Sequence, residues 1–322
     1  MPKNLMWSYL IHLSAHMWDD EFSVPEGLYL KNGYRETNGT DLEIWDDTIR
    51  FLAECKYTHV LIDVGDAVKY ERHPEISAPD AWDKDFIKKK LDEIRALGMT
   101  PIPKLNFSTC HDTWLKKYRR MISTPEYYEA CTDCIREVSE VFGSPEYFHL
   151  GFDEEFPDYQ IACQYDTCTV RGEHLWWHDL NLFVKECEKW GSRAWVWSDY
   201  YWLHRDIFIK RMSKEILQSN WFYGNIKNYT AEEKKGYFAL NAVDAYGELS
   251  ELGFDQVPTS STFANTWNTY QTVSLGHERI TNGLYGFMTA PWKFTCARDK
   301  FVLKDDAYRL YLARKEIYPE TL

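Results

Sequence analysis

The chain has 322 residues, a hydrophobic fraction of 44% and a formal net charge of −13 at pH 7. This length fits one large α/β barrel or two ordinary domains. The negative charge argues against a nucleic-acid or anionic-membrane partner, because the net field would repel either, and no apolar run approaches the ~18 residues of a membrane-spanning helix.

Strand-like apolar runs alternate with amphipathic helical segments, which is typical of parallel βα units. In chain order, the first half predicts strand 6–13, helix 41–55, strand 59–63, helix 83–97, strand 100–105, helix 125–142 and strand 147–151. The second half predicts helix 173–190, strand 193–197, strand 216–220, a helix around 242–252, strand 256–260, helix 267–281, strand 284–289 and a closing helix from about residue 305.

Eight such repeats in one chain make a closed barrel, and we predict a single (β/α)8 barrel domain over residues 1–322. An open doubly wound sheet would need a phosphate-binding glycine loop after its first strand, and the sequence has none. Pro-rich or Gly-rich linkers between domains are also absent. No cofactor is expected.

Aromatic residues make up 16% of the chain. Sugars present flat apolar C–H faces beside hydroxyl groups, so a site that holds them combines aromatic rings with carboxylates and amides. The composition therefore suits an oligosaccharide or glycoconjugate substrate, and it also suits a large aromatic core.

The N-terminus and the cysteines give information about the cellular compartment of the protein. The first residues lack the long apolar stretch of a signal peptide. We therefore expect a cytoplasmic protein if Met1 is native, and a secreted or periplasmic one if a signal has been removed. A structural zinc site is one hypothesis for Cys131, Cys134, Cys163 and Cys168, although we expect that these thiols are separate and unpaired.

Polar, acidic and aromatic residues follow most of the predicted strands, at the barrel end where chemistry collects. Any one of them can be a plain helix N-cap or a packing residue. Their recurrence around the barrel nevertheless predicts a binding site. The candidate substrate-binding residues are Asp66, His111, His149, Trp197, Asp199, Trp221, Tyr223 and Trp292.

Three adjacent carboxylates, Asp153, Glu154 and Glu155, follow the fourth predicted strand. Crowding of like charges favours the protonated form of one of them, which suits a general acid near neutral pH. We predict that Glu154 is this acid and that Asp153 stays ionised to hold a substrate group or a developing positive charge. His149 is expected to orient a carboxylate or to pack inside the barrel.

The run His149-Leu150-Gly151-Phe152-Asp153-Glu154 resembles the His-x-Gly-Gly-Asp-Glu motif of the family 20 β-N-acetylhexosaminidases. Other segments follow in the family's order: Asp63 to Asp66, residues 100–106 through His111, Trp197-Ser198-Asp199, Trp221 and Trp292. The resemblance implies a glycoside hydrolase that removes terminal N-acetylhexosamine by substrate-assisted retaining catalysis. Glu154 would protonate the glycosidic oxygen, Asp153 would orient the acetamido group, and the tryptophans would wall the pocket.

Phe152 departs from the family, because it replaces the second glycine of the motif and is expected to add bulk beside the acid. The sugar-binding arginine that the family places near its first strand has no match either. Two alternatives stay open. One is a conventional two-carboxylate glycosidase, with Glu154 as acid and Asp66 or Asp199 as nucleophile or base. The other is a sugar-binding barrel without catalysis.

Overall fold

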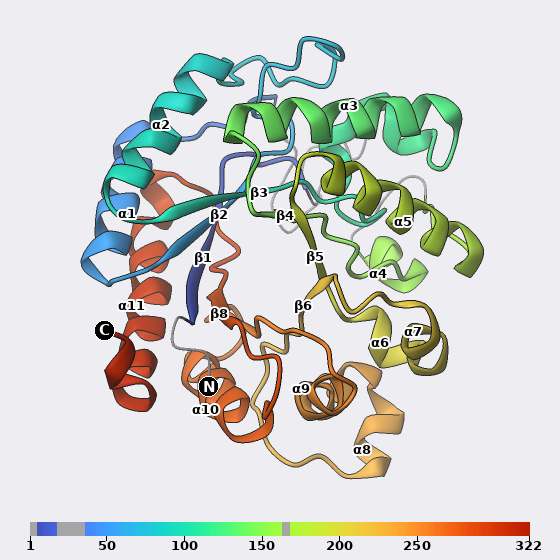
Figure 1. Cartoon of the computed structure of the whole chain (residues 1–322), viewed down its shortest axis with the longest axis vertical. Helices are drawn as coiled ribbons and strands as arrows, with labels where there is room; N and C mark the ends of the chain where they lie inside the picture. Colours follow the sequence, from blue (N-terminus) through green and yellow to red (C-terminus); the bar gives the residue numbers. More distant parts are fainter. Residues whose placement is uncertain (1–4, 18–35, 163–167) are drawn as a thin grey trace.

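The computed structural model describes residues 5–17, 36–162 and 168–322, which form one parallel eight-stranded sheet ringed by helices (Figure 1). The strand order is β6-β5-β4-β3-β2-β1-β8-β7. Isolated bridges from Gln218 to Gln256 and from Trp221 to Thr259 join the two edges of the sheet. The sheet therefore curves round into a barrel, which confirms the predicted (β/α)8 fold.

The strands lie where the alternation predicts them. They are β1 (Met6–His12), β2 (His59–Asp63), β3 (Thr100–Lys104), β4 (Tyr147–His149), β5 (Arg193–Trp197), β6 (Leu217–Ser219), β7 (Thr259–Ser260) and β8 (Gly286–Thr289). β7 is shorter than expected and begins just after Pro258, which has no backbone N–H to donate to a neighbouring strand. Lys104 is in register with both Asp63 and His149, so β2, β3 and β4 end at one level.

Within the described ranges, seven long helices surround the strands: α1 (Leu42–Glu54), α2 (Lys84–Ala96), α3 (Pro125–Phe142), α5 (Glu173–Lys189), α9 (Ala242–Glu251), α10 (Asn268–Arg279) and α11 (Lys300–Ile317). The side chains of Asp41, Asp83 and Thr124 cap α1, α2 and α3, and Gly143 ends α3 in the left-handed conformation. α11 begins five residues before the predicted start, because the 3-10 turn Ala297–Asp299 leads directly into it. None of the described helices is long and apolar enough to cross a membrane.

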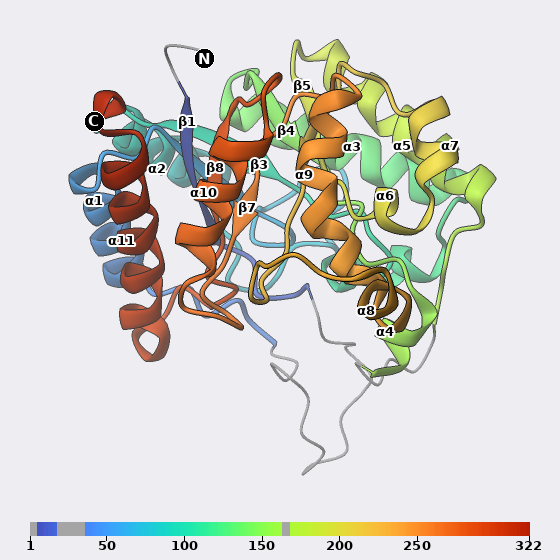
Figure 2. The same ribbon diagram turned by 90° about the horizontal axis from the view of Figure 1, so that it is seen from below.

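Four short helices were not predicted: α4 (Pro157–Ala162), α6 (Tyr200–Leu203), α7 (Arg205–Arg211) and α8 (Ala231–Gly236). They lie in the connections that follow β4, β5 and β6. In Figure 2, α4 and α8 both lie at the lower edge of the molecule, beyond the strands. α4 and α8 therefore thicken one end of the barrel.

The barrel interior is filled with side chains. Leu10, Leu61, Ile102, Trp195 and Met288 form its apolar centre, while a larger cluster fills the layer between the strands and the helices. Because the interior is packed, a ligand has to bind at an end of the barrel and not inside it.

Candidate active site

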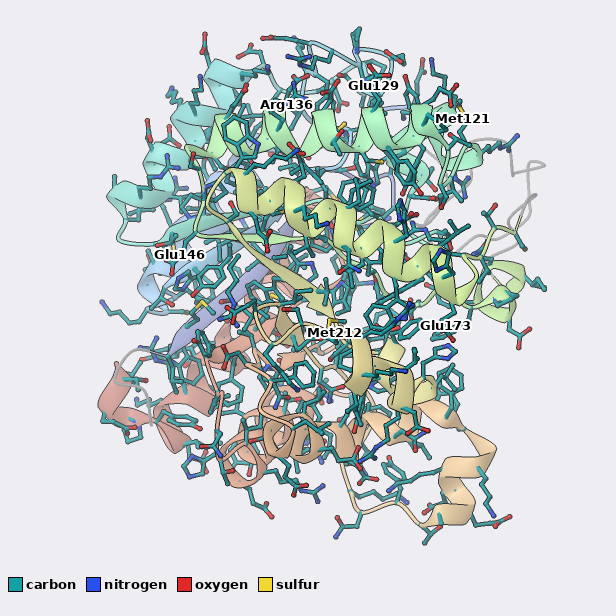
Figure 3. All side chains as sticks on the ribbon, turned by 45° about the vertical axis from the view of Figure 1, so that its right-hand side comes forward. Met121, Glu129, Arg136, Glu146, Glu173 and Met212 are labelled. Atoms are coloured by element: carbon teal, nitrogen blue, oxygen red, sulfur yellow. The ribbon has the colours of Figure 1, made fainter. Side chains whose placement is uncertain are left out.

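A cavity of about 450 Å³ opens at the carboxyl ends of the strands. Figure 3 marks the two ends of the barrel, with Glu146 just before β4 at one end and Glu173 at the start of α5 at the other. The sequence-predicted residues that line the cavity are His111, Asp153, Glu154, Trp197, Trp221, Tyr223 and Trp292. They come from the ends of five different strands or from the loops that follow them, so the fold brings together residues that are far apart in the sequence.

Asp153 lies at the floor of the cavity, and its side chain is 9% exposed. Asn106 Nδ2 donates a hydrogen bond to Asp153 Oδ1 at 2.9 Å, and His111 Nε2 lies 3.3 Å from Asp153 Oδ2. Burial would raise the pKa of this carboxyl, but His111, Lys104 and Asn106 together bring it below its ordinary value. Asp153 is therefore held in the ionised form.

The backbone of Gly151 makes room for this arrangement. Its φ is +75°, and a Cβ on it would lie 1.9 Å from Asn106 Oδ1. A glycine is therefore required both by the left-handed conformation and by the close approach of the Asn106 amide, which reaches Asp153.

His111 links the two carboxylates, since its Nε2 also lies 3.1 Å from Glu154 Oε2. Burial would lower the pKa of His111, but the charges and hydrogen bonds of Asp153 and Glu154 outweigh burial and raise it to about 10. His111 is therefore a cation at neutral pH, and it fixes the relative positions of the two carboxylates.

Glu154 is more exposed than Asp153, with 22% of its side chain accessible. Its backbone N–H donates to Asp199 Oδ2 at 2.8 Å, and its φ of +53° is in the left-handed region. This conformation is uncommon for residues other than glycine, and it persists only where surrounding contacts hold it.

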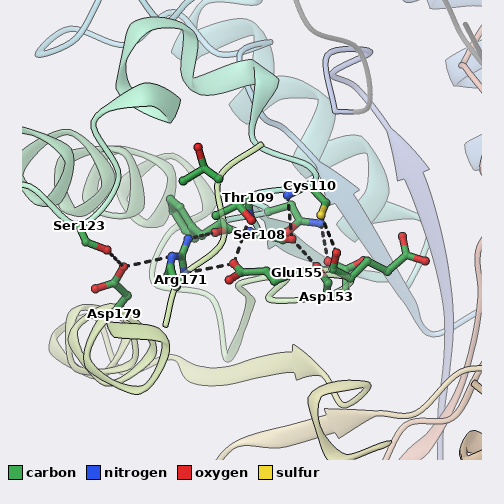
Figure 4. Close-up of polar contacts among 12 residues, drawn as sticks. Ser108, Thr109, Cys110, Ser123, Asp153, Glu155, Arg171 and Asp179 are labelled. Atoms are coloured by element: carbon green, nitrogen blue, oxygen red, sulfur yellow. Dashed lines mark hydrogen bonds and ion pairs between the residues drawn. The ribbon is translucent and has the colours of Figure 1, made fainter. Parts of the chain in front are cut away.

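The loop after β3 supplies such contacts (Figure 4). The Ser108 hydroxyl donates to the Asp153 carbonyl oxygen and the Cys110 thiol to that of Glu154. Thr109 N–H donates to Glu155 Oε1 at 3.1 Å. One loop thus holds three consecutive acidic residues.

Replacing Ser108 with Ala should lower the free energy of unfolding by about 1–3 kcal/mol, because the buried Asp153 carbonyl loses its donor. Urea denaturation measures this change. Ser139→Ala is the matched control, because the buried Ser139 hydroxyl has no hydrogen-bond partner among the described residues. Equal losses in the two variants would contradict the proposed contact.

Aromatic rings form the walls of the cavity. The ring centroids of Trp197 and Trp292 are 5.9 Å apart, and Trp221 and Tyr223 stack at 5.0 Å. Tyr223 also lies 6.1 Å from Trp292, so the four rings form a continuous surface. Such a surface suits the apolar face of a sugar ring and the methyl group of an acetamide.

Three predicted binding residues are not part of the cavity lining. Asp66 is buried and accepts hydrogen bonds from Ser14 Oγ at 2.8 Å and from Lys116 Nζ at 2.8 Å. Its other neighbour is His16 Nδ1, at 2.6 Å. Although burial would raise its pKa, His16 and Lys116 lower it below the ordinary value. Asp66 therefore ties loops together and has no free oxygen for a substrate.

His149 packs inside the barrel, which is one of the two roles that the sequence predicts for it. It is fully buried, its ring is 4.6 Å from that of Trp197, and Gly151 N–H lies 3.1 Å from its Nδ1. Burial and the charge of Lys104 lower the pKa of His149 well below its ordinary value. A neutral His149 supports Trp197 from below, while the cation beside the carboxylates is His111.

Asp199 lies behind Glu154 and does not line the cavity. It is buried, and burial and then the charge of Asp153 raise the pKa of its carboxyl well above the ordinary value. Among the carboxyl groups around Glu154, those of Asp199 and Glu155 therefore have raised pKa values.

Phe152 adds its bulk to the core and not to the cavity. Its side chain is 1% exposed, and its ring packs against Trp176 at 5.4 Å and Phe183 at 6.1 Å. Its φ is +67°. The substitution of the motif's second glycine thus fills space beneath α5, which corrects the expectation of bulk beside the acid.

Glu155 and Arg171 form a buried ionic group that the sequence did not predict (Figure 4). Arg171 lies 3.4 Å from Glu155 Oε1 and 3.2 Å from Asp179 Oδ2, and it also donates to the Phe107 carbonyl. Its guanidinium is 5.0 Å from the ring centre of Phe152. Because Glu155 follows the proposed acid directly, this group anchors the acidic segment to α5.

The cysteines do not gather around a common point within the described ranges. Cys131 and Cys134 are buried free thiols in α3, Cys168 is an exposed free thiol, and Cys163 lies outside the described residues. In the part of the chain that the structure describes, the one group of three side chains spaced for a metal ion is His111, Asp153 and Glu154. In this structure His111 pairs with both carboxylates, so the three side chains form an ion-paired cluster.

A wider hollow of about 690 Å³ lies between α3 and α5, on the outside of the barrel. Figure 3 shows Glu129 and Arg136, two of its residues, along α3. Its Glu186 is paired with Lys189 at 2.5 Å. This hollow is away from the strand ends, so we place the candidate active site in the smaller cavity.

The cavity also has lining residues that sequence reasoning missed. They are Met17, Tyr159, Phe222, Gly224, Tyr237, Ala239, Phe263, Ala264 and Lys293. Most belong to the long connections after β4, β6 and β7, where no periodic pattern indicates which side chains turn inward.

No protein-family model and no curated protein sequence matches this chain. Its structure is similar to that of a GH20 exo-β-N-acetylglucosaminidase from Vibrio harveyi, with a TM-score of 0.58 and 14% identity over 99% of this chain and 58% of that one. It is similar to the chitobiase of Flavobacterium johnsoniae, with a TM-score of 0.60 and 12% identity over 89% of this chain and 50% of that one.

Dispersin B is a third similar structure, with a TM-score of 0.62 and 13% identity over 98% of this chain and 99% of that one. This chain thus spans just over half the length of the Vibrio enzyme and half that of the chitobiase, but nearly all of Dispersin B. At these identities the likeness concerns the fold. The chain has the barrel fold of the family 20 glycoside hydrolases, the family whose motif its acidic segment resembles.

Proposed function

We propose that this protein is a glycoside hydrolase that removes terminal N-acetylhexosamine from an oligosaccharide or glycoconjugate by substrate-assisted retaining catalysis. The observation that carries the proposal is the arrangement of Asp153 and Glu154. Both carboxylates contact His111, and both line a cavity walled by tryptophans.

Asp153 suits the role of acetamido partner. It is ionised at the floor of the cavity, where a buried carboxylate accepts a hydrogen bond strongly from an amide N–H. As the acetamido oxygen bonds to the anomeric carbon, positive charge develops on the nitrogen, and the negative charge of Asp153 stabilises it.

Glu154 suits the role of acid and base. It is the more exposed of the two carboxyl groups, so it is placed to meet the glycosidic oxygen on the open side of the cavity. It gives its proton to that oxygen as the bond to the anomeric carbon breaks. It then accepts a proton from the water that attacks the anomeric carbon and releases the acetamide.

A conventional pair of carboxylates fits the structure less well. Such a mechanism needs a second carboxylate facing the same sugar as Glu154. Asp66 and Asp199, the two candidates, do not line the cavity, and Asp66 is bound by Ser14 and Lys116.

A thiazoline that mimics the cyclic intermediate tests the mechanism. We expect the protein to hydrolyse aryl β-glycosides of N-acetylglucosamine or N-acetylgalactosamine but not of glucose, and the thiazoline to inhibit it competitively. Asp153→Asn should weaken thiazoline binding and lower kcat by about 10²-fold or more, because the developing charge loses its partner. Hydrolysis of plain glucosides without thiazoline inhibition would overturn substrate assistance.

A further inference from the structure

The cavity has an inner and an outer part that differ in burial. The inner residues Asp153 and Trp197 are 6% and 1% exposed, whereas Tyr237 and Phe263 at the mouth are 58% and 50% exposed. A sugar whose anomeric carbon lies beside Glu154 occupies the inner part. Among the described residues, the outer part is then bordered by Tyr237 and Phe263 and faces the group attached to that sugar.

The two exposed rings come from separate parts of the chain. Tyr237 lies between α8 and the 3-10 turn Phe238–Asn241, and Phe263 lies between β7 and α10. Single exposed aromatic side chains are common on protein surfaces and need no explanation. Two that border the mouth of one cavity, from connections after different strands, are a more specific observation.

The Tyr237 segment is also connected to the proposed catalytic segment. Phe238 packs edge-on against Phe156 at 5.2 Å, and Phe156 lies two residues after Glu154. Phe156 N–H in turn donates to the Glu154 carbonyl at 2.7 Å. The Tyr237 ring lies 6.1 Å from that of Phe238, so Phe238 connects it to the loop that carries the acid.

The mouth is largely neutral. Of the described residues that line the cavity, Lys293 is the charged one apart from His111, Asp153 and Glu154. The cavity volume of about 450 Å³ falls within the range of about 300–1,000 Å³ that holds ligands larger than one sugar ring. An aromatic, weakly charged mouth suits the apolar face of a neutral sugar.

We propose that Tyr237 and Phe263 bind the second sugar unit of the substrate, on the leaving-group side of the scissile bond, and so favour oligosaccharides over small glycosides. This inference rests on the proposed function. Because Glu154 is the more exposed carboxyl group, the leaving group it protonates points toward the mouth, where the two rings lie.

The test uses two substrates that differ in the leaving group. One is the β-fluoride of N-acetylglucosamine, whose leaving group has no ring. The other is the N-acetylglucosamine disaccharide that the parent enzyme cleaves best among those of different linkages. For Tyr237→Ala and Phe263→Ala we expect kcat/KM on the disaccharide to fall roughly two- to tenfold each. On the fluoride it should stay unchanged.

Phe301→Ala is the matched control, because Phe301 is an 82% exposed ring on α11 that does not line the cavity. It should change neither rate. Equal losses on both substrates, or unchanged disaccharide kinetics in variants of an active enzyme, would overturn the outer site alone. A parent enzyme that cleaves neither compound, nor an aryl β-glycoside of N-acetylgalactosamine, would instead contradict the proposed hydrolase.

Discussion

Replacing Glu154 with Gln should lower kcat by about 10²–10⁴-fold, the range that positioned acid–base groups contribute. The amide keeps the shape of the side chain but has no proton to give to the glycosidic oxygen. Sugar affinity should change little, because the aromatic walls and Asp153 are untouched. Steady-state kinetics on an aryl N-acetylhexosaminide and calorimetric titration with the free sugar measure the two effects.

Glu173→Gln is the control for this substitution. Glu173 begins α5 at the same end of the barrel, its side chain is 58% exposed, and it is not part of the cavity lining. Its replacement should leave kcat unchanged. Full activity in Glu154→Gln would assign the acid to another residue. A parent protein that binds sugars but cleaves no glycoside would favour the sugar-binding barrel.

Replacing Arg171 with Met should lower the free energy of unfolding by about 3–5 kcal/mol, because it leaves buried carboxylates without their cation. Arg171 is fully buried between Glu155 and Asp179, so solvent cannot take over its role. Methionine keeps much of the apolar stem of the side chain, and the loss therefore reports mainly on charge. Urea denaturation gives the free energies.

The pH dependence of this loss distinguishes a charge effect from a packing effect. Burial raises the pKa of Glu155 to about 7, against the opposing charge of Arg171. A carboxyl whose pKa is higher in the folded state binds more protons there than in the unfolded state, so it lowers stability as pH rises from about 4 through 7. Without Arg171 that pKa rises further. The loss should therefore be larger at pH 8 than at pH 5, whereas a packing defect would cost the same at both.

The sequence predicted the fold well, because each βα unit has a local pattern of apolar residues that can be recognised. The predicted bounds are correct for strands 59–63 and 193–197 and for helix 125–142. Their apolar periodicity is strong, and Gly98, Gly143 and Gly191 mark the ends of helices. The short helices α4, α6, α7 and α8 could not be predicted in the same way. They have four to seven residues, too few to show a period.

For the candidate site, the sequence predicted which residues lie at strand ends, but it did not predict the direction in which each side chain points. Asp153, Glu154 and the tryptophans follow strand ends and converge, as the barrel geometry requires. Asp66 also follows a strand, but it pairs with Lys116, which belongs to a 3-10 segment that no local pattern connects to it. Arg171 was missed because it lies in the connection between β4 and α5, where no periodic pattern links it to Glu155 and Asp179.

The barrel wall is not braced equally on all sides. β1 pairs with β2, and β2 with β3, over five successive residues, whereas β6 and β7 meet through isolated bridges at Gln218 and Trp221. Sparse backbone pairing lowers the cost of local displacement. The same holds beside the acidic segment, since β3 and β4 share the single register pair of Lys104 with His149. The position of the two carboxylates after β4 therefore depends on the contacts of the loop after β3 as well as on the sheet.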